Sequence, residues 1–177
     1  AEKAARFLQL CDAFDLPVLS LCDTPGFMVG PDSEAAGAVR RVSRMFIAGA
    51  KLGTPLFCIV LRKGYGLGAQ AMAGGGFHSP FFIASWPTGE FGGMGLEGAV
   101  KLGYAKELAA ETDPEKQKAL YDQLVGRLYA AGKATSMAAA LEIDAVIDPA
   151  ETRRWVVRGL DSCPPRRKPA RGWVDAW

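Results

Sequence analysis

The sequence has 177 residues, of which 49% are hydrophobic and 23% are charged. This length and composition are typical of one globular domain with a sizeable core. The net charge of +2 provides no general attraction for nucleic acid or an anionic membrane surface, so neither is an expected partner. No apolar run of about 18 residues is present, so no membrane span is predicted. The four cysteines lack C-x-x-C spacing, and we expect free thiols and no metal site.

The first half of the chain alternates between helical patterns and short apolar strands. It begins at Ala1 inside a helical pattern, so we expect it to be part of a longer or processed chain. The strand at 18–22 lacks polar alternation, which favours burial on both faces. Helices are predicted at 2–14, from Asp32 or Ser33 to the break at 52–55, and from about Gly68 to Met72; strands are predicted at 18–22, 56–61 and 81–85. This alternation predicts an α/β fold with a largely parallel sheet, with ligands bound at the carboxyl ends of its strands.

The second half is predicted to be mainly helical. Helices are expected at 93–108, 114–131 and 136–141, followed by a short strand at 145–147 and a helix that starts near the capping sequence 148–151. The last stretch is basic, aromatic and contains proline. We therefore assign residues 1–163 to one domain and residues 164–177 to a tail that docks on a neighbour or frays.

Two loops, at 23–30 and 62–70, each follow a buried strand and precede a helix. In the second loop, Gly64, Gly66 and Gly68 free the backbone to approach a ligand closely. The helix that follows starts with free N–H groups at its positive end, which suits an oxyanion hole made of backbone. A tight turn with glycines for packing explains the same spacing equally well.

Side chains for acid–base or nucleophilic catalysis are scarce. The turn at 68–70 has no Ser or Cys, and His78 is the only histidine, so we interpret it as structural. Glu97 is interpreted as a surface carboxylate, whereas Glu90 stays open between a solvated loop residue and an acid–base group. This scarcity favours a reaction in which substrate and cofactor exchange the proton themselves. The arginines form a solvated face or an interface: Arg40, Arg41 and Arg44.

The order of five segments, 7–14, 23–27, 62–66, 86–90 and 143–153, resembles the C-terminal domain of acyl-CoA carboxylase carboxyltransferase subunits. Propionyl-CoA carboxylase β subunits are similar. The resemblance implies a crotonase-type fold, a ββα spiral, forming the C-terminal half of a carboxyltransferase. It also implies an N-terminal half that binds CoA, and a dimer-based homo-oligomer such as a hexamer, in the cytoplasm or, in a eukaryote, the mitochondrial matrix.

The resemblance further implies carboxyl transfer from carboxybiotin to the α-carbon of an acyl-CoA. Biotin would arrive on a carrier domain or subunit, after carboxylation by a biotin carboxylase component. The backbone of Leu67 and Gly68 would form the oxyanion hole, and the freed biotin nitrogen would take the α-proton before the enolate attacks CO2. The residues implied for the biotin site are Pro25, Gly26, Phe27, Tyr65 and Gly66.

The second loop departs from the K-A-Y-G-G-A-Y-D common in propionyl-type enzymes. Leu67 restricts the backbone where the family has Gly, and Gln70 replaces an Asp associated with acyl-chain choice. Gln70 is therefore the predicted substrate-binding residue, for a larger or different acyl group. The alternatives are a biotin-dependent decarboxylase subunit, a crotonase-type hydratase or isomerase without biotin, and a non-enzymatic scaffold.

Overall fold

The computed structural model describes residues 1–164, and the centre of the fold is a five-stranded sheet. The strand order is β1-β2-β3-β5. Strand β4 pairs with residues 63–65 of β2, which follow the part of β2 that pairs with β3. All four pairings are parallel, as the sequence predicts. The strands are β1 Val18–Thr24, β2 Leu56–Tyr65, β3 Phe82–Ser85, β4 Glu90–Gly92 and β5 Ala145–Val146.

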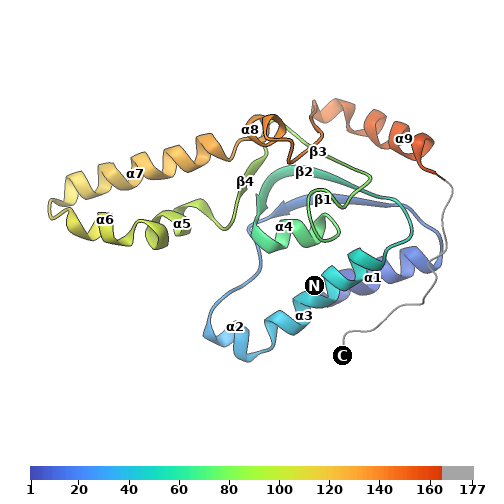
Figure 1. Ribbon diagram of the computed structural model, residues 1–177, viewed down its shortest axis with the longest axis horizontal. Helices are drawn as coiled ribbons and strands as arrows, with labels where there is room; N and C mark the ends of the chain where they lie inside the picture. Colours follow the sequence, from blue (N-terminus) through green and yellow to red (C-terminus); the bar gives the residue numbers. More distant parts are fainter. Residues whose placement is uncertain (165–177) are drawn as a thin grey trace.

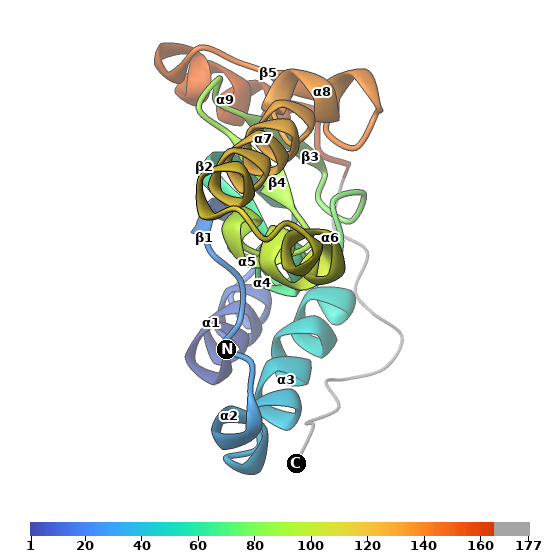
Figure 2. The ribbon, with the colours of Figure 1, turned by 90° about the vertical axis from the view of Figure 1, so that its left-hand side faces the viewer.

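Helices cover the two faces of this sheet unequally (Figures 1 and 2). Three helices, α1 Glu2–Ala13, α3 Ala38–Lys51 and α4 Gly66–Met72, lie on one side, and α9 Thr152–Ser162 lies on the other. Successive residues of β2 therefore enter opposite cores: Cys58 and Val60 pack with α4, whereas Phe57 and Ile59 pack towards α9. A central strand with helices on both sides buries every residue, which explains its continuous apolar sequence.

The edge strand β1 contradicts the prediction that it is buried on both faces. Its residues alternate, with Val18 and Cys22 buried and Leu19 and Leu21 exposed by 42% and 50%. The physical reason is that, among the described residues, α9 packs over β2 and β3 and leaves the outer face of β1 open. Apolar composition alone does not distinguish an open strand from a buried one.

The remaining elements differ from the predicted boundaries at glycines and in one short strand. The helix predicted to start at Asp32 or Ser33 is divided by Gly37, which has a φ of +78°. Strand β2 continues four residues beyond the predicted end at Leu61, and β4 is an additional strand. The other elements are α2 Pro31–Ala35, α5 Leu96–Gly103, α6 Ala105–Ala110, α7 Pro114–Ala131, α8 Ala134–Ala139 and the 3-10 turn Pro149–Glu151.

Helices α5, α6 and α7 form an arm that projects from the sheet (Figure 1). Asp113 caps α7 by accepting a hydrogen bond from the backbone N–H of Glu115 at 2.9 Å, in front of Pro114. The arm returns to the sheet at Gly132, whose carbonyl accepts the N–H of Phe91 in β4 at 2.8 Å. The predicted tail falls mostly on residues 165–177, outside the described residues.

Close contact between α3 and the turn after α4 leads to a stability prediction. A Cβ added at Gly49 would lie 2.6 Å from the carbonyl carbon of Gly74, and backbone cannot rotate away. We expect Gly49→Ala to lower the free energy of unfolding by about 1–3 kcal/mol, measured by urea denaturation. The matched control is Gly126→Ala in α7, where the added Cβ meets open space. That change is expected to be neutral or stabilising by about 0.5–1 kcal/mol. Equal effects of the two changes would contradict the prediction.

Candidate functional site

The two loops singled out in the sequence meet at the carboxyl ends of β1 and β2. A Cβ added at Gly68 would lie only 2.8 Å from the Cα of Gly26, and one added at Gly26 would lie 3.4 Å from the carbonyl oxygen of Tyr65. Gly26 has a φ of +104°, and its N–H donates to Thr24 Oγ1 at 3.2 Å. The backbones of the two loops are therefore in direct contact, as expected for a parallel sheet.

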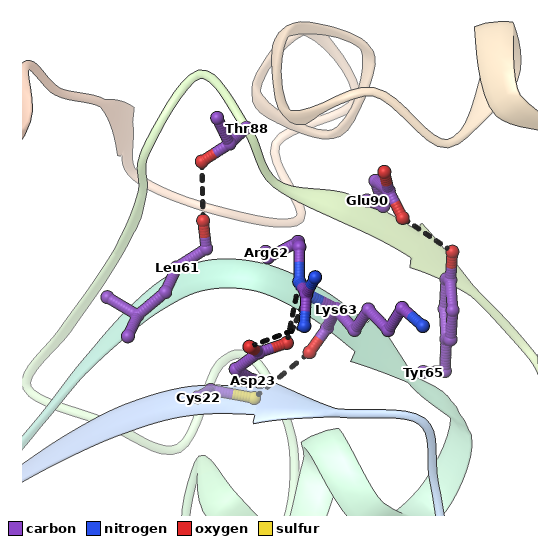
Figure 3. A network of polar contacts seen from close by, with 8 residues as sticks. All are labelled: Cys22, Asp23, Leu61, Arg62, Lys63, Tyr65, Thr88 and Glu90. Carbon is purple, nitrogen blue, oxygen red and sulfur yellow. Dashed lines mark hydrogen bonds and ion pairs between the residues drawn. The ribbon is translucent and has the colours of Figure 1, made fainter.

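An acidic side chain fixes the strands where these loops begin (Figure 3). The β1–β2 register shifts between Cys22 and Thr24, and the Asp23 carboxylate at this irregularity accepts the N–H of Lys63 at 3.0 Å. It also pairs with the Arg62 guanidinium at 3.2 Å. The Lys63 hydrogen bond is the largest cause that holds the pKa of Asp23 below its usual value, with Arg62 adding to it. Asp23 thus links β1 to the segment that leads into the second loop.

Strand β2 passes directly into α4 at a corner formed by Gly66, Leu67 and Gly68. Gly66 has a φ of +57°, and a Cβ there would lie 2.6 Å from the carbonyl oxygen of Gly93. The first four residues of an α-helix have no acceptor within the helix for their N–H groups. In α4 these include Leu67 and Gly68, and no side chain caps the helix. Leu67 is 59% exposed, whereas Gly68 is buried against Gly26.

Two hollows flank this corner and divide the predicted site residues between them. One, of about 280 Å³, lies between α3 and residues 27–29 and is lined by Phe27 and Leu67. The other, of about 480 Å³, is lined by Gly66, Gln70 and apolar side chains from β4, α5 and α7. The structure therefore brings Leu67 and Phe27 together in one hollow, and places Gln70 in the other.

Tyr65 and Glu90 form a pair that the sequence did not predict. Tyr65 is only 2% exposed, and its hydroxyl donates to Glu90 Oε2 at 2.9 Å (Figure 3). Burial, followed by the hydrogen bond to Glu90, raises the pKa of Tyr65 above its usual value. Its ring is therefore part of the packing beneath the corner, and its hydroxyl faces β4. Because β4 has only three residues, no periodicity in the sequence indicated this contact.

The other candidate side chains lie in surface contacts. Glu97 accepts the Tyr129 hydroxyl at 2.8 Å, on the helical arm. His78, interpreted as structural, is largely exposed, with Nε2 3.6 Å from Glu142 Oε2. Arg41 and Arg44 pair with Glu2 at 3.9 and 3.4 Å. Within residues 1–164 there is no group of three or more potential metal ligands among His, Cys, Asp and Glu, and no helix long and apolar enough to cross a membrane.

A parallel sheet covered by helices, with a backbone corner at the carboxyl end of a central strand, defines a crotonase-type α/β domain, as in its solved structural neighbours. Residues 1–168 match the family model described as the carboxyl transferase domain. The chain belongs to this family.

Relatives of known identity agree with this assignment. The chain is 35% identical over 170 residues to the carboxyltransferase subunit of propionyl-CoA carboxylase from Haloferax mediterranei, covering 95% of this chain and 32% of the relative. It is 34% identical over 172 residues to the methylmalonyl-CoA carboxyltransferase 12S subunit of Propionibacterium freudenreichii, with the same two coverages of 95% and 32%. The chain thus spans about a third of the length of these relatives.

Solved structures show the same fold. A single-chain, multi-domain long-chain acyl-CoA carboxylase is 58% identical, with a TM-score of 0.78 over 89% of this chain and 15% of that one. The transcarboxylase 12S hexamer with methylmalonyl-CoA bound is 32% identical, with a TM-score of 0.84 over 98% of this chain and 33% of that one. These similarities confirm the predicted family and fold class.

Proposed function

We propose that this chain provides the biotin-side half of a site that transfers a carboxyl group from carboxybiotin to the α-carbon of an acyl-CoA. The observation that carries the proposal is the corner at Gly66–Gly68, where α4 begins without a side-chain cap and the exposed Leu67 lines an apolar hollow. Membership of the carboxyl transferase family supports it. The relatives' roughly threefold greater length supports a CoA-binding half in the same protein or a partner.

Biotin supplies a ureido group that gives up CO2 and can then accept the α-proton of the acyl-CoA. This chain's contribution is to stabilise negative charge on the ureido oxygen. The N–H groups of Leu67 and Gly68, at the positive end of α4, would donate to that oxygen. The donors are fixed by the strand and helix that contain them, so they need no reorganisation during the reaction. Phe27, held beside Leu67 by the loop at Gly26, offers an apolar surface to the bicyclic ring.

The chain's own side chains support a role without general acid–base catalysis. Proton transfer is left to the substrate and cofactor, because the two candidate carboxylates already accept hydrogen bonds within the protein. Glu90 accepts from the Tyr65 hydroxyl and Glu97 from the Tyr129 hydroxyl. A hydratase or isomerase would instead need a carboxylate directed at the acyl thioester. A biotin-dependent decarboxylase would use the same corner in the opposite direction. It is the second candidate because the corner's geometry serves both directions equally.

The hollow of about 480 Å³ beside Gly66 is the proposed place for the acyl group. Gln70 lines it as a neutral amide, together with apolar residues such as Phe77, Leu96 and Met137, and Glu142 contributes a carboxylate. This mainly apolar lining with one acidic side chain favours an apolar chain over an anionic group. The similar structure at 58% identity is a long-chain acyl-CoA carboxylase. We therefore place the substrate among acyl-CoA esters with a group larger than propionyl.

The test is the reverse reaction, carboxylation of biocytin from a 2-carboxyacyl-CoA, with the complete carboxyltransferase that contains this chain. Turnover is expected with the complete enzyme and a long-chain 2-carboxyacyl-CoA, and methylmalonyl-CoA is expected to be the poorer donor. Residues 1–177 alone are expected to be inactive, because half of the site is absent. No transfer by the complete enzyme would contradict the function, and turnover by the isolated chain would contradict the half-site.

A further inference from the structure

We infer that the Tyr65–Glu90 pair is a positioning device that holds the backbone corner in its donor-presenting geometry. The inference rests on the proposed function and assigns a role to two side chains that do not themselves reach the reacting atoms. The pair lies one residue before the corner and connects β2 with β4.

The contact spans the end of the sheet diagonally. In the β2–β4 ladder, Lys63 is opposite Glu90 and Tyr65 is opposite Gly92. The Tyr65 hydroxyl therefore reaches back along β4 to the Glu90 carboxylate, at 2.9 Å. The Tyr65 side chain is buried, so the loss of this bond leaves a partner without its hydrogen bond in a poorly solvated place. The pair thus fixes the register of a strand with only three residues of ladder.

The residue after β4 transmits this register to the corner. The carbonyl oxygen of Gly93 packs against Gly66 so closely that an added Cβ would approach it to 2.6 Å. A shift of β4 along β2 therefore moves a backbone carbonyl that is already in contact with the first residue of α4. On its other side β4 is held by the arm, through Phe91 N–H and the carbonyl of Gly132. Tyr65–Glu90 is a side-chain hydrogen bond that joins β4 to β2 directly.

A side-chain hydrogen bond on the other side of the sheet provides the control. Trp86 Nε1 donates to Thr152 Oγ1 of α9 at 3.0 Å, almost the length of the Tyr65–Glu90 bond. It joins the segment after β3 to α9 and forms no part of the β2–β4 ladder. The Tyr129–Glu97 pair of the arm is unsuitable, because Tyr129 also interacts with Tyr65 and Glu90.

The experiment compares four variants of the complete carboxyltransferase: Tyr65→Phe, Glu90→Leu, Glu90→Gln and the control Thr152→Val, which removes the acceptor of Trp86. Each is assayed for carboxyl transfer to biocytin, with kcat and KM determined separately, and for thermal unfolding. Tyr65→Phe and Glu90→Leu are expected to lower kcat about tenfold or more, because a small misplacement of a catalytic group has effects of this size or larger. The KM for the CoA ester is expected to rise by less than kcat falls, because Gly66 and β4 also line the hollow proposed for the acyl group.

Glu90→Gln keeps an oxygen that can accept from Tyr65 and is expected to retain at least half of the wild-type kcat. Thr152→Val is expected to keep wild-type kcat. Unchanged kcat in Tyr65→Phe, or equal losses in Glu90→Leu and Thr152→Val that follow their thermal stability, would overturn the inference. An inactive wild-type enzyme would instead count against the proposed function, so the two failures are distinguishable.

Discussion

Replacing Leu67 with proline is expected to reduce carboxyl transfer by about 10²–10³-fold in kcat, the usual effect of removing one donor from an oxyanion hole. Proline has no N–H, and the first turn of a helix is the part that accepts it without losing an intrahelical hydrogen bond. Leu67 is the second residue of α4 and is largely exposed. The change therefore removes a donor from the corner with little loss of packing.

Leu67→Ala is the matched control, because it shortens the same side chain and keeps the N–H. It is expected to retain at least half of the wild-type kcat, with a modest rise in KM for biocytin if the leucine side chain contacts the ring. Both variants are assayed in the complete enzyme, and thermal unfolding and oligomer mass are measured alongside. If the proline variant is folded, assembled and as active as the alanine variant, the N–H of Leu67 has no role in transfer.

Gly66→Ala is expected to have the largest combined effect on stability and activity. Gly66 has a φ of +57°, where a residue with a Cβ is strained by about 1–2 kcal/mol. The new Cβ would also lie 2.6 Å from the carbonyl oxygen of Gly93, which is backbone. Together we expect a loss of about 2–3 kcal/mol in the free energy of unfolding, measured by urea denaturation. Because relief of the contact must move α4 or β4, we also expect carboxyl transfer to fall at least about tenfold.

The control is Gly93→Ala on the opposite side of the same contact. A Cβ at Gly93 has nothing within 4 Å, and its φ is not in the left-handed region. We expect its stability to stay within about 0.5 kcal/mol of wild type, as for most surface changes. If Gly66→Ala is as stable and active as Gly93→Ala, the contact between Gly66 and Gly93 does not determine the corner.

Much of the sheet could be predicted from the sequence because its strands are short apolar runs between clear breaks. The runs at 18–22, 56–61 and 81–85 all lie within or next to observed strands. Their parallel arrangement follows from the intervening helices. The prediction that β1 is buried on both faces was wrong, because Leu19 and Leu21 face a side of the sheet that α9 does not reach. A local pattern does not contain the position of a helix about 130 residues away.

The meeting of the loops at 23–30 and 62–70 was also predictable, since parallel strands bring their carboxyl ends to one edge of the sheet. The Gly26–Gly68 contact is its direct result. The Tyr65–Glu90 pair was not predictable in the same way, because it depends on β4, which is held by the distant Gly132. The helix was predicted to start near Gly68, whereas α4 starts at Gly66 and includes Leu67. That Leu67 and Gln70 line two different hollows depends on distant elements, α3 for one and β4, α5 and α7 for the other.

The most direct measurement is a crystal structure of the complete carboxyltransferase with biotin or biocytin bound. The account predicts the ureido oxygen within about 2.7–3.1 Å of the backbone nitrogens of Leu67 and Gly68, with the ring against Phe27. A bound ring whose ureido oxygen faces other donors, while these two amides contact only solvent or protein, would contradict the account.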